Sequence, residues 1–327
     1  MAFSSRNRVL APLAMLATLA CVAGAAAQTY PNKPIKMIVG FAPGGPADVM
    51  ARLIAQRMPA ILGQSFIVEN RPGAGGTIGA KAAAESEPDG YTLLLGNTST
   101  LVISPMVYKN VGYDAVKAFA PVAILGATSN LLVVTPALPV TSVRELIAYA
   151  KANPGKLNYA TPGAGTPPHL IGEMFKLKAG IDIVHVPYKG GGSTGQAVIA
   201  GETQMTFENP AVSLPLAQAG LVRGLAVTSE RRNPQAPELP TMIESGVPDF
   251  VSVSFTGVVA PAGTPSAIVL RLNAAINESL KSPEIQSTLT KLSVEARIGS
   301  PEDFSAFLAQ ERTRWAPVVQ AANVKAE

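Results

Sequence analysis

Short runs of β-branched and apolar residues alternate with amphipathic stretches along most of the chain. Short apolar runs predict buried strands, and longer stretches with apolar positions three and four apart predict helices. The predicted strands are 35–41, 65–70, 92–96, 122–126, 131–134, 157–160, 183–186, 204–208, 224–228 and 253–260, and the predicted helices are 47–61, 77–84, 142–152, 168–178, 194–200, 211–219, 266–282 and 301–321. Strands that alternate with helices predict an α/β fold with largely parallel sheets.

Two apolar segments, 131–134 and 253–260, lie where a chain of this length is expected to pass between two lobes. The second segment follows a proline-rich stretch, Pro234–Pro240. Two crossings make a hinge and place a cleft between the lobes. The lobes expected from these crossings are residues 28–129 plus 252–327 for lobe 1 and residues 130–251 for lobe 2. One large domain is the alternative interpretation.

The first 27 residues have the pattern of a secretory signal peptide. Arg6 and Arg8 precede an apolar run, and small residues ending in Ala25-Ala26-Ala27 follow it. The run is shorter than the roughly 20 residues that a membrane span needs. We therefore expect an exported, periplasmic protein cleaved near Ala27. An uncleaved anchor and a lipid anchor on Cys21 are the alternatives.

Cleavage changes the composition in two ways that exclude classes of function. Cys21 is the only cysteine, so the mature chain has no disulfide, no thiolate nucleophile and no thiolate metal site. Loss of Arg6 and Arg8 from the 26 basic residues leaves 24 against 22 acidic residues. A nearly neutral chain without a basic cluster argues against nucleic acid as a partner.

The loop between the first predicted strand and helix is the leading candidate for an anion site. Its residues 41–48 read Phe-Ala-Pro-Gly-Gly-Pro-Ala-Asp. Pro46 suits the first helical turn, and Gly45 lets a ligand approach the backbone. Free N–H groups and the dipole at a helix start attract anions. Asp48 is expected to stabilise the helix start or to bind a ligand N–H or O–H, and a ligand-free tight turn is the alternative.

Three further loops follow predicted strands and offer small, neutral polar groups. They are residues 97–100, residues 161–166 and residues 187–194. Ligands of open α/β sheets bind outside the carboxyl ends of the strands, so four such loops on two lobes strengthen one another. The candidate ligand-binding residues are Phe41, Ala42, Gly45, Pro46, Ala47, Asp48, Asn97, Thr98, Ser99, Thr161, Gly163, Gly165, Thr166, His169, Tyr188, Gly190, Gly191, Glu208 and Asn209. For His169, a helix-start or partly buried structural role is the alternative to ligand contact.

No enzyme or cofactor motif is complete in this sequence. Residues 191–195 match G-x-S-x-G around Ser193, but a hydrolase elbow of this kind requires a later histidine. Both histidines, His169 and His185, precede Ser193, and other triad orders leave Asp182 as the candidate acid. The glycines at 73–79 have the wrong spacing for a dinucleotide loop, and no H-E-x-x-H zinc motif occurs. We expect no catalytic residue, no metal and no cofactor, with an exported serine hydrolase as the least favoured alternative.

The motifs together resemble the Bug (Bordetella uptake gene) family of periplasmic solute-binding receptors, which serve tripartite tricarboxylate transporters. The resemblance runs through nearly all of the mature chain, in the segments Tyr30–Ile35, Phe41–Asp48, Glu69–Gly76, Pro88–Leu93, Val186–Gly191 and Val259–Pro265. It implies a periplasmic-binding-protein (Venus flytrap) fold, in which two α/β lobes are joined by two interlobe crossings. It also implies a monomer that has membrane subunits of such a transporter as its partners.

The resemblance also implies a ligand and a way of holding it. A small carboxylate, with aliphatic and aromatic dicarboxylates among the candidates, contacts the loop 41–48 through backbone N–H groups and waters. Opposing contacts come from residues 161–166, residues 188–194 and the segment Phe207-Glu208-Asn209. Family members often carry Asp at the position of Glu208. Presentation of the ligand to a sensor kinase is the alternative output.

Overall fold

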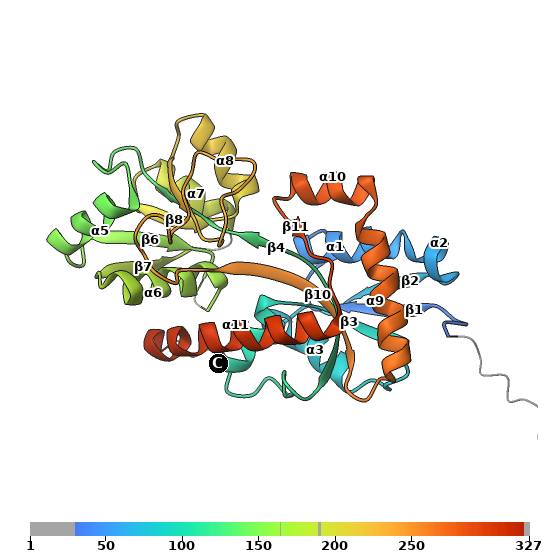
Figure 1. Ribbon diagram of the computed structural model, residues 1–327. Helices are drawn as coiled ribbons and strands as arrows, with labels where there is room; N and C mark the ends of the chain where they lie inside the picture. Colours follow the sequence, from blue (N-terminus) through green and yellow to red (C-terminus); the bar gives the residue numbers. More distant parts are fainter. Residues whose placement is uncertain (1–29, 164, 189–190, 324–327) are drawn as a thin grey trace, which may run out of the picture.

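The computed structural model describes residues 30–163, 165–188 and 191–323, which form two α/β lobes (Figure 1). The first lobe contains a six-stranded sheet and the second a five-stranded sheet. The predicted fold of two α/β lobes is therefore confirmed. The predicted signal peptide lies outside the described residues. Within the described part of the chain, no helix is long and apolar enough to cross a membrane.

The first sheet has the strand order β11-β4-β10-β3-β1-β2. Its strands are β1 (Ile35–Val39), β2 (Phe66–Asn70), β3 (Thr92–Asn97), β4 (Phe119–Ser129), β10 (Val253–Pro261) and β11 (Glu295–Ala296). The strands β1, β2 and β3 are parallel, whereas β10, β4 and β11 pair antiparallel. The expectation of largely parallel sheets is wrong for this half of the sheet, because β4 and β10 run in opposite directions between the lobes. The helices of this lobe include α1 (Pro46–Ala55), α2 (Met58–Leu62), α3 (Thr77–Ala84), α9 (Ser266–Leu280) and α10 (Pro283–Lys291).

The second sheet has the strand order β7-β6-β8-β5-β9. Its strands are β5 (Leu131–Val134), β6 (Leu157–Thr161), β7 (Ile183–Pro187), β8 (Met205–Glu208) and β9 (Arg223–Val227). The strands β6, β7 and β8 are parallel, and β5 pairs antiparallel with β8 and β9. The helices of this lobe are α5 (Val143–Ala152), α6 (Pro167–Ala179), α7 (Gly191–Ile199) and α8 (Pro210–Gln218).

The two chain passages between the lobes are joined to one another by Thr228. The chain passes at Asn130, between β4 and β5, and again at Ser252, just before β10. The Thr228 hydroxyl accepts a hydrogen bond from the Asn130 N–H (2.8 Å) and donates one to the Ser252 carbonyl (2.6 Å). All three residues are buried. The two segments that were predicted to cross between the lobes, 131–134 and 253–260, are strands β5 and β10 of the two sheets. The chain passes between the lobes one residue before each of them, at Asn130 and at Ser252.

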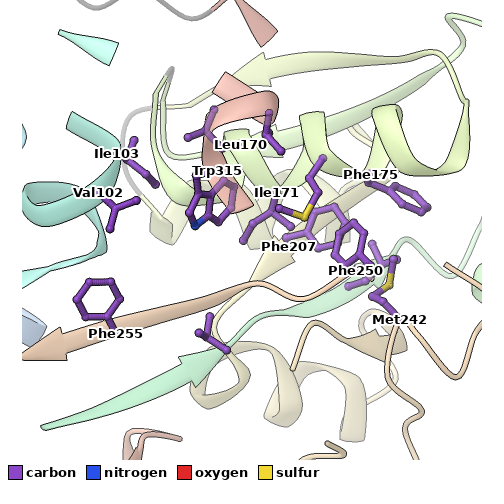
Figure 2. Close-up of a cluster of buried hydrophobic side chains, with 14 of the residues drawn as sticks. Val102, Ile103, Leu170, Ile171, Phe175, Phe207, Met242, Phe250, Phe255 and Trp315 are labelled. Atoms are coloured by element: carbon purple, nitrogen blue, oxygen red, sulfur yellow. The ribbon is translucent and has the colours of Figure 1, made fainter. Parts of the chain in front are cut away.

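The last helix, α11 (Pro301–Ala322), is a third connection between the lobes. It packs against β4 of the first lobe and against α6 of the second. Trp315 of α11 is fully buried, and Figure 2 shows it beside Leu170 and Ile171 of α6. The same buried cluster continues to the aromatic side chains of Phe175, Phe207 and Phe250. One hydrophobic cluster therefore contains residues of both lobes.

Besides the short 3-10 helix η1 (Ala74–Gly76), the sequence pattern missed two helical segments. Residues 98–107 form a continuous helix that contains a π-helical turn, Ser99–Ile103, followed by α4 (Ser104–Val107). The polar residues at its start are typical of a loop. The helix α10 buries only Ile285 and Leu289, so its apolar stripe is too short to stand out.

Candidate ligand site at the strand ends

The carboxyl ends of the parallel strands lie next to the crossings in both lobes. In the first sheet, Asn97 at the end of β3 pairs with Thr256, three residues after the start of β10 at Val253. That separation is about 10 Å along an extended strand. In the second sheet, Glu208 at the end of β8 pairs with Leu131, the first residue after the crossing. The two strand edges that are expected to bind a ligand therefore border the same interlobe region.

The loop after β1 leads directly into α1, as the sequence predicted. Gly45 is the N-cap residue, and Pro46 is the first helical residue. The first intrahelical hydrogen bond is donated by the N–H of Val49 to the Gly45 carbonyl (2.9 Å). The N–H groups of Ala47 and Asp48 precede that bond, so they belong to the donors that a helix start leaves for caps, water or ligands. Phe41 and Ala42 follow the end of β1, before this helix start.

Asp48 organises the loop after β1. Its carboxylate accepts hydrogen bonds from the Gly44 N–H, the Arg52 guanidinium and the Asn70 amide, each at 2.9 Å. The hydrogen bond from Arg52 is the largest of the effects that lower the pKa of Asp48, to about 2. The side chain is buried. This geometry favours the structural role of Asp48 at the helix start, because its carboxylate already accepts from three protein donors.

Asn70 is a site residue that was missed at the sequence level. It ends β2 beside β1, where Val39 is its register partner. Its amide donates to the Asp48 carboxylate (2.9 Å) and to the Phe41 carbonyl (3.0 Å). The available signal was its position at the end of a strand, immediately before the glycine-rich stretch that starts at Gly73.

The loop after β3 is the start of a helix and contains internal contacts. The Asn97 side chain accepts a hydrogen bond from the Thr100 N–H (3.1 Å), as an N-cap residue does. The Thr98 hydroxyl is buried and accepts from the Phe255 N–H (2.9 Å). Ser99 is half-buried at the same edge. Of these three candidates, Thr98 therefore anchors the loop to β10.

The glycines after β2 bring a third loop to this edge. Gly76 lies against Phe41 and Thr100, and a Cβ atom there would sit 2.6 Å from the Thr100 methyl group. Its φ of 92° also favours glycine. The short helix η1 (Ala74–Gly76) and then α3 begin at this point. Three helices of lobe 1 thus start beside the ends of β1, β2 and β3.

In lobe 2, the loop after β6 is held by its own polar groups and by two histidines. The Thr161 hydroxyl lies 2.6 Å from Nε2 of His185, and the Thr166 hydroxyl donates to the Gly163 carbonyl (2.7 Å). The Gly165 N–H donates to Nδ1 of His169 (3.0 Å). Gly163 and Gly165 both have positive φ angles, 144° and 73°, so the loop requires glycine at these positions.

The helix start after this loop offers fewer donors than the sequence suggested. Pro167 and Pro168 occupy the first two positions of α6 and have no N–H. The first intrahelical bond is donated by Leu170 to the Thr166 carbonyl (3.1 Å). His169 therefore carries the remaining N–H of this helix start.

Glu208 and Asn209 lie together at the end of β8. Glu208 accepts hydrogen bonds from the Thr194 hydroxyl (2.6 Å) and from the Asn209 N–H (3.1 Å). Burial raises the pKa of Glu208 and outweighs these two donors. Asn209 caps α8 by accepting from the Ala211 N–H (2.8 Å). Glu208 is thus held against α7, at the edge of the sheet that faces the crossings.

The Tyr188 side chain is engaged within lobe 2. The Tyr188 hydroxyl donates to the Glu202 carboxylate (3.3 Å), beyond the carboxyl end of α7. This contact directs the hydroxyl away from the strand ends, so only the backbone of Tyr188 remains a candidate for the site. The backbone N–H of Tyr188 donates to the Thr161 carbonyl (2.8 Å). Gly190 lies outside the described residues. The backbone of Gly191 begins α7.

Among the described residues, the position of Ser193 does not match a hydrolase triad with Asp182. Ser193 lies in α7 after the carboxyl end of β7, whereas Asp182 immediately precedes the amino end of that strand. Nε2 of His185 is engaged by Thr161, and Nδ1 of His169 by Gly165. Among the described residues, no group of three histidine, aspartate or glutamate side chains is placed to hold a metal ion.

Two surface hollows are lined by residues other than the candidate site residues. One of about 320 Å³ is lined by Leu101, Met106, Tyr113 and Arg312, between the helix after β3 and α11. Another of about 540 Å³ is lined by Arg297, Phe307 and Gln310. The candidate site is defined instead by the converging loops.

Comparisons with known proteins agree on one family. The sequence model of a protein family, the tripartite tricarboxylate transporter family receptor, matches residues 50–324 of this chain. Protein BugT of Bordetella pertussis (strain Tohama I) is 38% identical over 321 residues, which cover 98% of each chain. The structure of R. palustris Rpa4515 with adipate is 38% identical and covers 90% of this chain and 99% of its own, with a TM-score of 0.76. The structure of MatC (Rpa3494) from Rhodopseudomonas palustris with bound malate is 31% identical and covers 89% and 100%, with a TM-score of 0.73.

Proposed function

This chain belongs to the receptor family of tripartite tricarboxylate transporters, and we propose that it captures a small dicarboxylate between its two strand edges. The family assignment confirms the resemblance identified from the sequence motifs. Receptors of this family are periplasmic, and we propose the same compartment here, with export by the predicted signal peptide. The partners proposed on this basis are the membrane subunits of a transporter of the same type.

The placement of the strand ends is the observation that carries the proposal. Parallel strands of both sheets end beside the crossings, and helices start directly after them. Helix starts present N–H groups and a positive dipole end, which suit a carboxylate on each side of the interlobe region. Boundaries of the lobes near residues 130 and 252, as proposed from the sequence, fit this arrangement.

The ligand class follows from the chemistry of the loops and from relatives. The described loop residues that form the two edges are mostly glycine, alanine, proline, serine, threonine and asparagine, together with Phe41, Asp48, Arg71, His169, Tyr188 and Glu208. Arg52 is adjacent but pairs with Asp48 (2.9 Å). A charge-assisted hydrogen bond contributes about 1.5–3 kcal/mol, and micromolar affinity needs about 8 kcal/mol. Several N–H and O–H donors therefore suffice for a dicarboxylate, the class bound by the adipate and malate structures.

A thermal-shift screen tests this proposal. The purified mature protein is heated with adipate, malate and other dicarboxylates, and with the corresponding diamides as uncharged controls. We expect at least one dicarboxylate to raise the melting temperature in a concentration-dependent manner, because a ligand that binds only the folded state stabilises it. No stabilisation by any dicarboxylate, or equal stabilisation by a diamide, would refute the proposal.

A further inference from the structure

His169 and His185 form a stacked pair next to the loop after β6. Their ring centroids are 3.8 Å apart and their planes differ by 16°. His169 lies in the first turn of α6, and His185 is the middle residue of β7. The fully buried Tyr159 ring packs against the pair, with its centroid 5.2 Å from that of His185. The proposed capture of a dicarboxylate does not by itself account for this pair.

Both rings contact the described residues of the loop, which are 161–163, 165 and 166 and are called the Thr161 loop below. Nε2 of His185 meets the Thr161 hydroxyl at 2.6 Å. Nδ1 of His169 accepts the Gly165 N–H at 3.0 Å. The pair therefore holds the loop at two points, one near each end.

The contact with Gly165 requires a neutral imidazole. A backbone N–H is a donor, so Nδ1 of His169 must present a lone pair and the ring proton must lie on Nε2. A charged imidazolium carries a hydrogen on both nitrogens, which would place N–H against N–H. Charging both rings would also bring two positive charges within stacking distance.

We infer that the His169–His185 pair positions the Thr161 loop for ligand binding, and that protonation of the pair releases the loop. Both histidines are positioning residues in this inference, because they act through the loop rather than on the ligand. The inference rests on the proposed function for the identity of the ligand. The charge of the pair distinguishes two roles. A pair that positions the loop must stay neutral, whereas a histidine that binds the ligand carboxylate directly would be favoured in its charged form.

Among the described residues, few ionisable groups surround the pair. Helix α6 contributes Glu173 and Lys176, whose side chains are 3.1 Å apart, and β6 contributes Tyr159, which donates to Glu173 (2.6 Å). The range of α7 contains no ionisable side chain, and the carboxylate of Glu208 on β8 is bonded to Thr194. Glu173 is thus partly neutralised by its own partners and compensates little for a charge on the pair.

Burial lowers the pKa of both histidines. For His185 the pKa falls to about 4, with the neighbouring His169 as the second cause, and Glu173 acts in the opposite direction. At neutral pH both rings are therefore uncharged. On acidification below the ordinary histidine pKa of about 6.5, protonation competes increasingly with the loop contacts.

The test measures the loop and the ligand separately in the full mature protein. Hydrogen exchange of the Gly165 amide, expressed as protection relative to the intrinsic rate, is followed by NMR from about pH 7.5 to about pH 4.5 without ligand. Calorimetric titration with adipate and with malate covers the same pH range. The matched variant is His169→Asn/His185→Gln, which keeps an acceptor near each ring nitrogen but has no proton to gain.

We expect protection of Gly165 in the wild type to fall at least tenfold on acidification while circular dichroism shows the protein still folded. The wild type should lose at least tenfold more affinity than the variant over this range, since protonation of the ligand affects both proteins equally. Protection that stays constant in the wild type, or a pH profile that is the same in both proteins, would overturn the inference. An affinity that rises on acidification in the wild type alone would also overturn it, in favour of direct contact.

Failure of the proposed function has a different outcome. If no dicarboxylate of the thermal-shift screen binds at any pH, the proposed function is refuted, and the exchange of Gly165 still decides whether the pair holds the loop. If the double variant does not fold, His169→Asn alone tests the Gly165 contact. Its Gly165 protection should then be independent of pH over the same range.

Discussion

The Asp48 carboxylate and the Asn70 amide are joined by a hydrogen bond of 2.9 Å across 22 positions of sequence. This bond connects the start of α1 to the end of β2. Because Asn70 also donates to the Phe41 carbonyl (3.0 Å), the loop between β1 and α1 is fixed at both ends. The N–H groups of that loop are therefore held in place before any ligand arrives.

Replacing Asn70 by alanine should weaken dicarboxylate binding although the side chain is not proposed to touch the ligand. Loss of its hydrogen bonds is expected to cost about 1–2 kcal/mol, or about 5- to 30-fold in affinity. Calorimetric titration measures this change. Glu69→Gln is the matched control, because the Glu69 carboxylate binds Lys36 and Arg71 instead of the loop. Equal affinities in Asn70→Ala and the wild type would remove Asn70 from the site.

Asp48→Asn distinguishes loop organisation from ligand contact. An organising role predicts similar losses of affinity for adipate and for malate, whereas a contact with a ligand hydroxyl predicts a loss for malate alone. The variant should also lose about 1–3 kcal/mol of unfolding free energy at neutral pH, because one of the donors to the carboxylate is left unpaired. Parallel titrations with the two acids decide between the roles.

The same variant has a defined pH dependence. The pKa of Asp48 is lowered to about 2, so the folded state favours the ionised carboxylate. Its stabilisation is fully present above the ordinary pKa of 3.8 and is lost as the pH falls toward 2. Urea denaturation should therefore show the wild type and Asp48→Asn converging below about pH 3. A difference that is constant with pH would contradict the assigned ionisation.

Thr228→Val tests the connection between the two chain passages. Valine has nearly the same shape as threonine but leaves the buried Asn130 N–H and Ser252 carbonyl without the hydroxyl that binds them. Each unpaired group is expected to cost about 1–3 kcal/mol of unfolding free energy. Chemical denaturation measures the loss, and Thr228→Ser, which keeps the hydroxyl, is the control. A valine variant as stable as the serine variant would show that the hydroxyl is dispensable.

Glu208 should make stability decrease with rising pH. Burial raises its pKa above 4.5, so the folded state holds the proton more tightly than the unfolded state. The associated stability is present below pH 4.5 and is lost as the pH rises through the folded pKa. Glu208→Gln should flatten this decline, whereas Glu202→Gln, at an exposed site nearby, should not. Identical pH profiles of the wild type and Glu208→Gln would show that Glu208 is not buried in its charged form.

The local spacing of apolar residues was sufficient to predict the strands and helices that bury one clear apolar face. The strands β1 and β3 and the long helix α11 were predicted because their buried positions follow the expected periods. The helix at 98–107 was not, since Asn97 and Thr98 favour loops and the start of the helix is held by the distant contact between Thr98 and Phe255. The antiparallel half of the first sheet also could not be predicted, because strand direction there follows from the path between the lobes.

The candidate site was also only partly predictable from the sequence. The four loops were found because glycine and small polar residues follow strands. The roles of single side chains depend on distant partners: Asn70 acts on Asp48 only because β2 lies beside β1. His169 and His185 look isolated in the sequence, and only the packing of α6 against β6 and β7 brings their rings together.

The central claim is that this protein holds a small dicarboxylate between its lobes, and native mass spectrometry of the purified protein tests it most directly. The mature protein is measured as isolated, and again after dialysis and addition of adipate or malate. We predict one bound molecule per chain with the mass of a small dicarboxylic acid, and its displacement by an excess of a dicarboxylate that binds. A protein that carries no acid as isolated and takes up neither adipate, malate nor any other dicarboxylate would contradict the account.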